Sequence, residues 1–161
     1  MRCVVDTDVW IDLFEGGLIA EAATLGIEFI SPADMGGLDD IAGVYGELAV
    51  YAAPDPDELA KQGVQFIDLP GGVVDDFARL TTVYTGCSRV DLGALALAKV
   101  GETPLLTGDN ALRRAAESEN VVVHGTEWLL DRMLESGAIT TSRIAQFRED
   151  MRAAGRRVPI I

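Results

Sequence analysis

Three aspartates stand beside short apolar stretches of this 161-residue chain, where carboxylates commonly take part in chemistry. Asp6 follows the apolar residues 3–5, and Asp109 follows Leu105 and Leu106 through Thr107-Gly108. Asp91 lies in Ser88-Arg89-Val90-Asp91, at the start of a predicted helix. Carboxylates that gather at one place repel each other, and a hard divalent cation such as Mg²⁺ or Mn²⁺ relieves that repulsion. Because such ions activate water and neutralise charge on a phosphodiester, the pattern predicts metal-dependent phosphoryl chemistry.

Each of these acids also has a purely structural interpretation. Asp109 fits the N-cap of the helix that follows it, and Asp8 could cap the first helix. Ser88 and Asp91 fit a capping box, with Asp in place of the usual Glu. Asp6 is the hardest to explain in this way. A carboxylate that ends a buried strand costs on the order of several kcal/mol unless it is paired, hydrogen-bonded or bound to a metal.

A fourth acid would come from the helix predicted after the second strand. This segment offers Asp39, Asp40 and Glu47. Asp40 and Glu47 are seven residues apart and would share one face of the helix. Asp40 lies closer to the strand end, Glu47 lies deeper in the helix, and a solvated helix face explains either acid equally well.

The acids must be positioned by alternating strands and helices. Apolar runs and turn residues predict strands at 2–5, 27–30, 64–69, 104–106 and 120–123. Apolar periodicity and capping residues predict helices at 9–14, 18–25, 38–52, 56–61, 73–84, 89–100, 110–118, 127–134 and about 140–154, with Thr126 as the N-cap of the eighth. Short strands separated by helices indicate parallel βαβ units in a three-layer α/β sandwich. In such a sheet, ligands bind at the carboxyl ends of the strands, where Asp6 and Asp109 are expected.

Length and composition limit the classes of protein that the chain can represent. We expect a single domain over 1–161, with a C-terminal helix and tail from about 140. No apolar run approaches the length of a membrane span or a signal peptide, which favours a cytoplasmic protein without a membrane partner. Cys3, Cys87 and the single His124 have no zinc-site spacing, and we interpret His124 as structural.

The charge is strongly acidic, with a formal net value of −13 and only two lysines, Lys61 and Lys99. This balance argues against nucleic-acid affinity from bulk charge. The acids are spread along the chain, and we hypothesise that such a surface reflects a halophilic, salt-loving source.

Three segments resemble the PIN domain family in their order and approximate spacing. They are Val4-Val5-Asp6-Thr7-Asp8-Val9, Ser88-Arg89-Val90-Asp91-Leu92, and Leu105-Leu106-Thr107-Gly108-Asp109 with Ala111-Leu112-Arg113. The stretch from His124-Gly125-Thr126 to Gly137-Ala138-Ile139-Thr140 also resembles the C-terminal part of bacterial and archaeal PIN proteins. The resemblance extends over nearly the whole chain.

The resemblance implies a PIN-like α/β/α sandwich with a central, mainly parallel five-stranded sheet. It also implies a Mg²⁺- or Mn²⁺-dependent ribonuclease, often the toxin of a VapC-type toxin–antitoxin pair. Partners would then be RNA, a small antitoxin protein and a second copy in a homodimer.

Carried over by position, Asp6, Asp91 and Asp109 would be the metal-binding acids. The family's second acid, usually a Glu early in the helix after strand two, would be Asp40, with Glu47 as the alternative. Supporting roles would fall to Asp8, Ser88 and Thr107, the last by hydrogen bonding within the site, and Asn110 stands where family members often have a basic residue. Contacts to the RNA backbone would come from Arg113 and Arg114, with Arg152, Arg156 and Arg157 as weaker candidates for RNA or partner contacts.

Two other functions are compatible with some of these features. A haloacid-dehalogenase-like phosphatase would use Asp6-Thr7-Asp8 as its Asp-x-Asp motif and Lys99 near Asp109, but it leaves Ser88-x-x-Asp91 without a role. A PIN-like domain that binds RNA or a partner without cleavage fits the acidic surface and Asn110.

Overall fold

The computed structural model describes residues 1–33, 43–51 and 54–157, and within them the chain forms one five-stranded sheet. The strands are β1 (Arg2–Val5), β2 (Glu28–Pro32), β3 (Gln65–Ile67), β4 (Leu105–Leu106) and β5 (Val123–His124). Their spatial order is β3-β2-β1-β4-β5, and all four strand pairs are parallel. The predicted parallel α/β sandwich is therefore confirmed.

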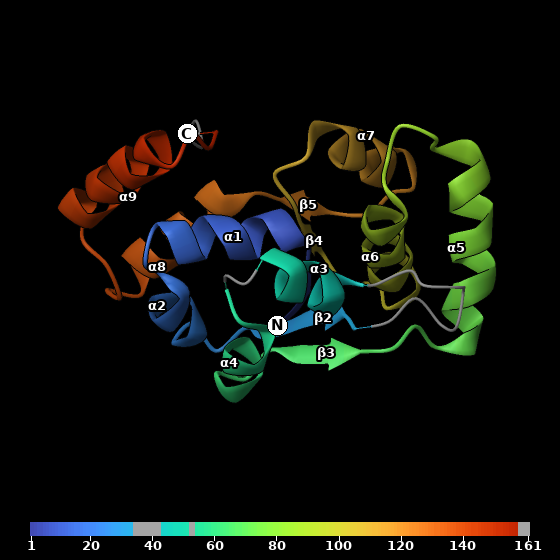
Figure 1. Cartoon of the computed structure of the whole chain (residues 1–161), viewed down its shortest axis with the longest axis horizontal. Coiled ribbons are helices and arrows are strands. Elements are labelled where there is room, and N and C mark those ends of the chain that lie inside the picture. Colours follow the sequence, from blue (N-terminus) through green and yellow to red (C-terminus); the bar gives the residue numbers. More distant parts are fainter. Residues whose placement is uncertain (34–42, 52–53, 158–161) are drawn as a thin grey trace.

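Helices cover both faces of the sheet, which gives the three layers visible in Figure 1. One apolar core contains Cys3, Val5, Trp10 and Phe147, and it lies beneath α1 (Thr7–Glu15), α2 (Ile19–Ala23), α8 (Thr126–Glu135) and α9 (Thr141–Ala153). The other contains Val4, Leu95 and Leu105, and it lies beneath α5 (Gly71–Val83), α6 (Arg89–Val100) and α7 (Asn110–Ser118). Because neighbouring residues of a strand point to opposite faces, Val4 and Val5 enter different cores.

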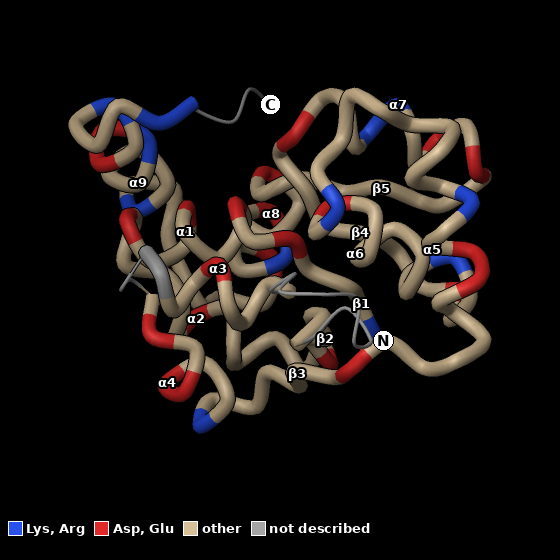
Figure 2. Tube along the Cα trace, turned by 45° about the vertical axis from the view of Figure 1, so that its right-hand side comes forward, with Lys and Arg blue, Asp and Glu red and all other residues tan. Residues whose placement is uncertain are grey.

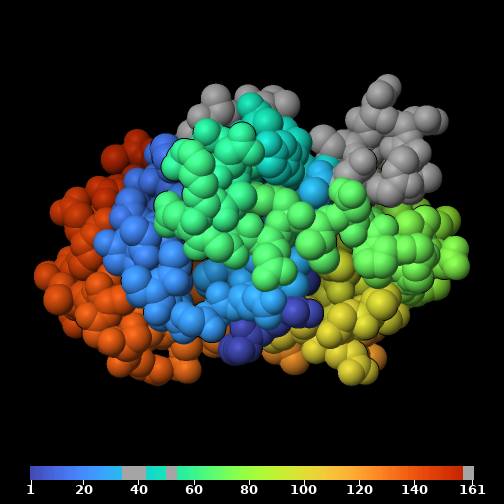
Figure 3. Space-filling view, turned by 90° about the horizontal axis from the view of Figure 1, so that it is seen from below, coloured from blue at the N-terminus to red at the C-terminus, as the bar shows by residue number. Residues whose placement is uncertain are grey.

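Two further helices lie beside β2 and β3. The described part of α3 spans Val44–Tyr51, and α4 spans Pro56–Lys61. Pro56 occupies the first turn of α4, where a missing N–H costs nothing, and Asp55 caps this helix. Figure 3 shows α4, in green, against the blue residues of the first two helices.

Several predicted boundaries were wrong for local physical reasons. The first helix begins at Thr7 instead of residue 9, because Asp6 is its N-cap, and Asp8 lies in its first turn. The last strand begins at Val123 instead of residue 120, because Asn120 has a left-handed φ of 60° that extended structure does not allow. Thr126 is not the N-cap of α8; Gly125 takes that position, and the Thr126 hydroxyl donates to Asp12.

Charge is distributed unevenly over the elements. Figure 2 shows acidic residues along most of the chain, whereas several basic residues gather on α9 and the segment that follows it. In the described part of the chain, no helix is long and apolar enough to cross a membrane.

Candidate acidic active site

The strand order places two carboxylates beside each other at the centre of the sheet. The chain builds β2 and β3 on one side of β1, and then returns to build β4 and β5 on the other side. The point where the order reverses lies between β1 and β4, and parallel sheets bind ligands at the carboxyl ends of strands at such a point. Asp6 directly follows β1, and Asp109 follows β4 by three residues.

Thr107 connects these two acids. Its fully buried hydroxyl donates to Asp6 Oδ2 at 3.0 Å and accepts from the Asp109 backbone N–H at 3.1 Å. Asp6 is itself only 3% exposed, and its Oδ1 accepts from the Thr7 N–H at 2.8 Å. Asp109 uses Oδ1 to cap α7 through the Leu112 N–H at 2.7 Å. The predicted N-cap of α7 and the predicted hydrogen bond of Thr107 both exist, and they fix the two carboxyl groups.

Asp8 contributes an oxygen without a partner. Its Oδ2 accepts from the Gly108 N–H at 3.0 Å, whereas its buried Oδ1 has no hydrogen-bond partner among the described residues. A side chain at Gly108 would place a Cβ 2.8 Å from Asp8 Oδ2, so any other residue here would require the Asp8 carboxylate to shift. A buried carboxylate oxygen that lacks a donor indicates a place where a cation could bind.

The remaining acids come from two helices on different sides of the sheet. Asp91 forms the predicted capping box: its carboxylate accepts from the Ser88 N–H at 3.1 Å, and the Ser88 hydroxyl accepts from the Asp91 N–H at 3.1 Å. Glu47 on α3 accepts from the Thr7 hydroxyl at 3.1 Å, which connects α3 to the start of α1.

Together these groups form one acidic pocket of about 190 Å³. The pocket has five carboxylate side chains, one arginine, one threonine and one isoleucine in its lining: Asp6, Asp8, Glu47, Asp91, Asp109, Arg156, Thr7 and Ile11. The predicted acids Asp6, Asp8, Asp91 and Asp109 are therefore brought together, and Glu47 joins them. Asp40 lies outside the described residues.

Burial and mutual repulsion disfavour the charged forms of these acids. Burial raises the pKa of Asp6 well above its usual value, and the nearby Asp8 and Asp91 raise it further. Burial is also the first cause of the raised pKa values of Asp8, Glu47 and Asp91. Asp91 adds to the rise at Asp8 and Glu47, and Asp109 adds to the rise at Asp91. Raised pKa values in a shared pocket are typical of functional sites.

The donor set fits a hard divalent cation in its chemistry. All five acidic side chains offer carboxylate oxygens, the ligands that Mg²⁺ and Mn²⁺ prefer, and Asp8 Oδ1 is unsatisfied. As they stand, no three of the described His, Cys, Asp or Glu side chains are arranged to hold one ion. The pocket therefore has suitable ligands that would have to move inward around an ion.

The predicted RNA-contacting arginines lie next to the pocket without lining it. The Arg113 Nη2 donates at 3.4 Å to the backbone carbonyl of Thr107, the residue that connects Asp6 and Asp109. Arg114 is exposed on the neighbouring part of α7.

Arg156 and Asp12 are the residues whose place the sequence did not indicate. The Arg156 Nε donates to Asp12 Oδ1, and its Nη2 donates to the Asp8 carbonyl at 3.3 Å. The sequence alone made Arg156 only a weaker candidate for RNA or partner contacts, and it gave Asp12 no role. The two residues lie 144 positions apart, and no local pattern could have paired them.

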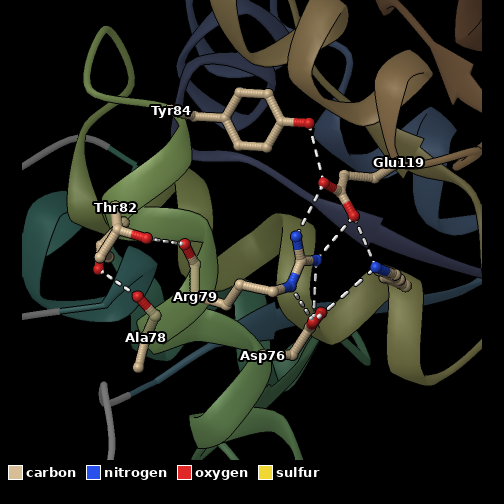
Figure 4. Close-up of polar contacts among 8 residues, drawn as sticks. Asp76, Ala78, Arg79, Thr82, Tyr84 and Glu119 are labelled. Carbon is tan, nitrogen blue, oxygen red and sulfur yellow. Dashed lines mark hydrogen bonds and ion pairs between the residues drawn. The ribbon is translucent and has the colours of Figure 1, made fainter.

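A second charged cluster, which includes Lys99, lies away from the acidic pocket and is shown in Figure 4. Glu119 accepts from Lys99 at 2.6 Å, from Arg79 at 2.7 Å and from the Tyr84 hydroxyl at 2.8 Å. The phosphatase alternative needs Lys99 near Asp109. Instead Lys99 lies with Thr103 and Pro104, which precede β4, at the opposite end of that strand from Asp109.

Comparisons with known proteins agree with this architecture. Residues 42–160 match a family described as DUF3368: PIN domain. A PilT N-terminus domain protein from the hyperthermophilic archaeon Sulfolobus solfataricus P2 has a similar fold, with a TM-score of 0.53 and 17% sequence identity over 84% of this chain and 95% of the other. A search of curated proteins finds no match. Because the family match spans most of the chain and the fold agrees, the chain belongs to the PIN domain family.

Proposed function

We propose that the protein is a metal-dependent endoribonuclease that cleaves RNA phosphodiester bonds with Mg²⁺ or Mn²⁺. PIN domains are usually nucleases and generally use divalent metals. The observation that supports the proposal most directly is the convergence of five carboxylates on one pocket at the switch point of the sheet.

In this proposal, Asp6, Asp91 and Asp109 hold the metal, and Glu47 supplies the fourth acid. Glu47 lines the pocket and accepts from the Thr7 hydroxyl, and Asp40 stays the alternative. A bound divalent ion supplies water activation and neutralises charge on the scissile phosphodiester. Thr107 orients Asp6 and Asp109, Ser88 orients Asp91, and Gly108 holds Asp8 in place. Arg113 and Arg114 would guide the RNA backbone toward the pocket.

The test is cleavage of a mixed pool of structured RNAs at high salt with Mn²⁺, with Mg²⁺ and with EDTA. The Asp91→Asn variant is the control. Cuts that require metal and disappear in the variant would support the proposal. If no lane shows cuts while metal raises the melting temperature, the second alternative, a PIN-like domain that binds without cleaving, is favoured.

We also propose that a small antitoxin helix and a second copy of the chain are partners. A pocket of about 500 Å³ lies between α1, α2 and α4, with Leu13, Phe14, Ile19 and Leu59 in its lining. Phe14 is 45% exposed, although a large aromatic side chain gains from burial. Light scattering of the wild type and of Phe14→Glu, alone and with the product of any adjacent small gene, tests both partners. Unchanged mass in all samples would refute them.

A halophilic source is the last part of the proposal. Excess surface acid with few lysines is expected to keep the protein hydrated in brine and to repel itself in dilute buffer. At about 1 M salt the Debye length is about 3 Å, so repulsion between the surface acids is screened. We expect the protein to unfold below roughly molar salt, where this screening is weaker. Circular dichroism across a salt series measures this, and full stability in dilute buffer would refute it.

A further inference from the structure

Arg156 is the one cationic side chain among the described residues that line the acidic pocket. Five carboxylates surround the same space, so the pocket as a whole repels an anionic substrate. Two structural devices hold this arginine in place, one in the backbone and one in a buried side chain.

The backbone device is the end of α9. Gly155 has a left-handed φ of 69°, and its N–H donates to the Arg152 carbonyl at 3.0 Å. The Arg156 N–H donates to the Met151 carbonyl at 2.9 Å. This pair of bonds is a Schellman motif, which needs a residue with positive φ and therefore favours glycine. The motif reverses the chain at the end of α9, so that Arg156 faces α1.

The side-chain device is Asp12, which is 8% exposed and lies on α1. Its Oδ1 accepts from Arg156 Nε, and its Oδ2 accepts from the Thr126 hydroxyl at 3.3 Å. The Arg156 Nη2 also donates to the Asp8 carbonyl at 3.3 Å. A guanidinium has five N–H donors, so these bonds leave donors on the Nη atoms for a ligand in the pocket.

A fixed guanidinium beside acids suits a phosphodiester better than it suits a neutral ligand. Arginine binds phosphate oxygens through two parallel N–H bonds, and pre-positioning reduces the entropy lost on binding. Ion pairing with Asp12 alone would not require that the arginine line the pocket.

We infer that Arg156 contacts the scissile or adjacent phosphate of the RNA and that Asp12 is the residue that positions it. This inference rests on the proposed ribonuclease function and adds a substrate contact that the family match does not assign. The C-terminal segment after α9 thereby becomes part of the site.

The test compares full-length wild type with Arg156→Ala, Arg156→Lys, Asp12→Asn and the double variant Arg156→Ala/Asp12→Asn. Arg2→Ala is the matched control, because it removes the same charge at an exposed ion pair with Glu28, at the end of β1 opposite to Asp6. Steady-state cleavage with Mn²⁺ gives kcat and KM, and fluorescence anisotropy gives the affinity for an oligonucleotide that cannot be cleaved. Melting temperatures show whether each variant is folded.

We expect Arg156→Ala to weaken oligonucleotide binding and raise KM about 10-fold, with lysine restoring part of the loss. Asp12→Asn should cause a smaller loss, and the double variant should be no worse than Arg156→Ala, because both act through one contact. Arg2→Ala should stay within about 2-fold of wild type.

The outcomes separate this inference from the proposed function. A wild type that cleaves, with Arg156→Ala equal to it in KM and in affinity, would overturn the inference and leave the function standing. A wild type that binds through Arg156 but never cleaves would overturn the function alone. Equal losses in Arg156→Ala and Arg2→Ala would show a general charge effect and would overturn the inference, as would a wild type that neither cleaves nor binds.

Discussion

The acidic pocket and the Glu119 cluster contain the same kind of group in opposite electrostatic situations. In the pocket, burial and neighbouring acids raise the pKa values of Asp6, Glu47 and Asp91. In the cluster, hydrogen bonds from Arg79, Lys99 and Tyr84 lower the pKa of Glu119 to about 2. The pocket disfavours the charged form of its carboxyl groups, whereas the cluster stabilises the charged form of Glu119.

The difference separates stability from function within one fold. The Glu119 cluster joins α5, α6 and the end of α7 with contacts that favour the folded state. The pocket concentrates like charges that disfavour it, as active sites commonly do. A cation that binds the pocket would make the two regions alike, because it would neutralise the repulsion there.

Replacement of Asp91 should produce the largest functional effect. Asp91→Asn removes one proposed metal ligand and keeps the side-chain size, and asparagine can still accept from the Ser88 N–H. We expect cleavage to fall about 100-fold or more, since loss of even an outer partner of a metal site costs about 10–100-fold. Single-turnover cleavage with Mn²⁺ measures the loss. A variant that stays fully active would remove Asp91 from the site.

Added Mn²⁺ should stabilise the wild type through the pocket. At about 100 times Kd, a ligand that binds only the folded state adds about 2.7 kcal/mol. The melting temperature should therefore rise by several degrees in the wild type and much less in Asp91→Asn. Differential scanning fluorimetry with Mn²⁺ and with EDTA measures both. Equal shifts in the two proteins would mean that the ion binds elsewhere.

Replacement of Glu119 should destabilise the folded state and leave RNA cleavage unchanged. Glu119→Gln removes one of the two carboxylates that Arg79 and Lys99 share, the other being Asp76. We expect a loss of about 1–2 kcal/mol in the free energy of unfolding, because the two basic side chains are partly exposed. Urea unfolding measures this loss. Asp75→Asn, at an exposed position on α5 with Arg79, is the control. Impaired cleavage at temperatures where Glu119→Gln is folded would contradict the separation of stability from function.

The free energy of unfolding of the metal-free protein should depend on pH through both regions, which act in opposite directions. Asp6, Glu47 and Asp91 have raised pKa values in the folded state, so the folded state binds more protons than the unfolded state as the pH falls. The free energy of unfolding therefore rises as the pH falls toward these pKa values. Glu119 has a lowered pKa, so its contribution is complete above about 4.5 and is lost as pH falls toward about 2. We expect the free energy of unfolding to be greatest at mildly acidic pH and to fall by about 1 kcal/mol on each side of this maximum.

The two variants assign the sides of this pH profile. Asp91→Asn should flatten the rise from neutral pH, and Glu119→Gln should flatten the fall at acidic pH. Thermal unfolding between pH 3 and 8 in EDTA gives the profile. A wild-type stability that decreases steadily from pH 7 to pH 5 would contradict the charge repulsion in the pocket.

Local patterns predicted the parts of the fold and site that depend on local interactions. The Ser88–Asp91 capping box and the Asp109 cap involve residues within three positions of each other, and both exist. The meeting of Asp6 and Asp109 was predictable because parallel strands bring their carboxyl ends to one edge. The parallel sheet followed from the alternation of short apolar strands with helices.

Long-range partners account for what the sequence did not predict. The bond between Thr7 and Glu47 spans 40 positions, so local spacing could not show that Glu47 lines the pocket. Thr126 has the residue type of an N-cap, but its hydroxyl donates to Asp12, which is 114 positions away. Asn120 adopts a left-handed turn that apolar periodicity does not reveal.

The strand order also has a consequence for the way the molecule reaches its folded state. β1 pairs with β4, which follows it by about 100 residues in the sequence, and Arg156 follows later still. Pairings between such distant segments fold slowly, because a long loop must close before the contact forms. Until α9 and Arg156 have left the ribosome, the nascent chain lacks the complete pocket, so we expect the site to assemble only after this segment has been made.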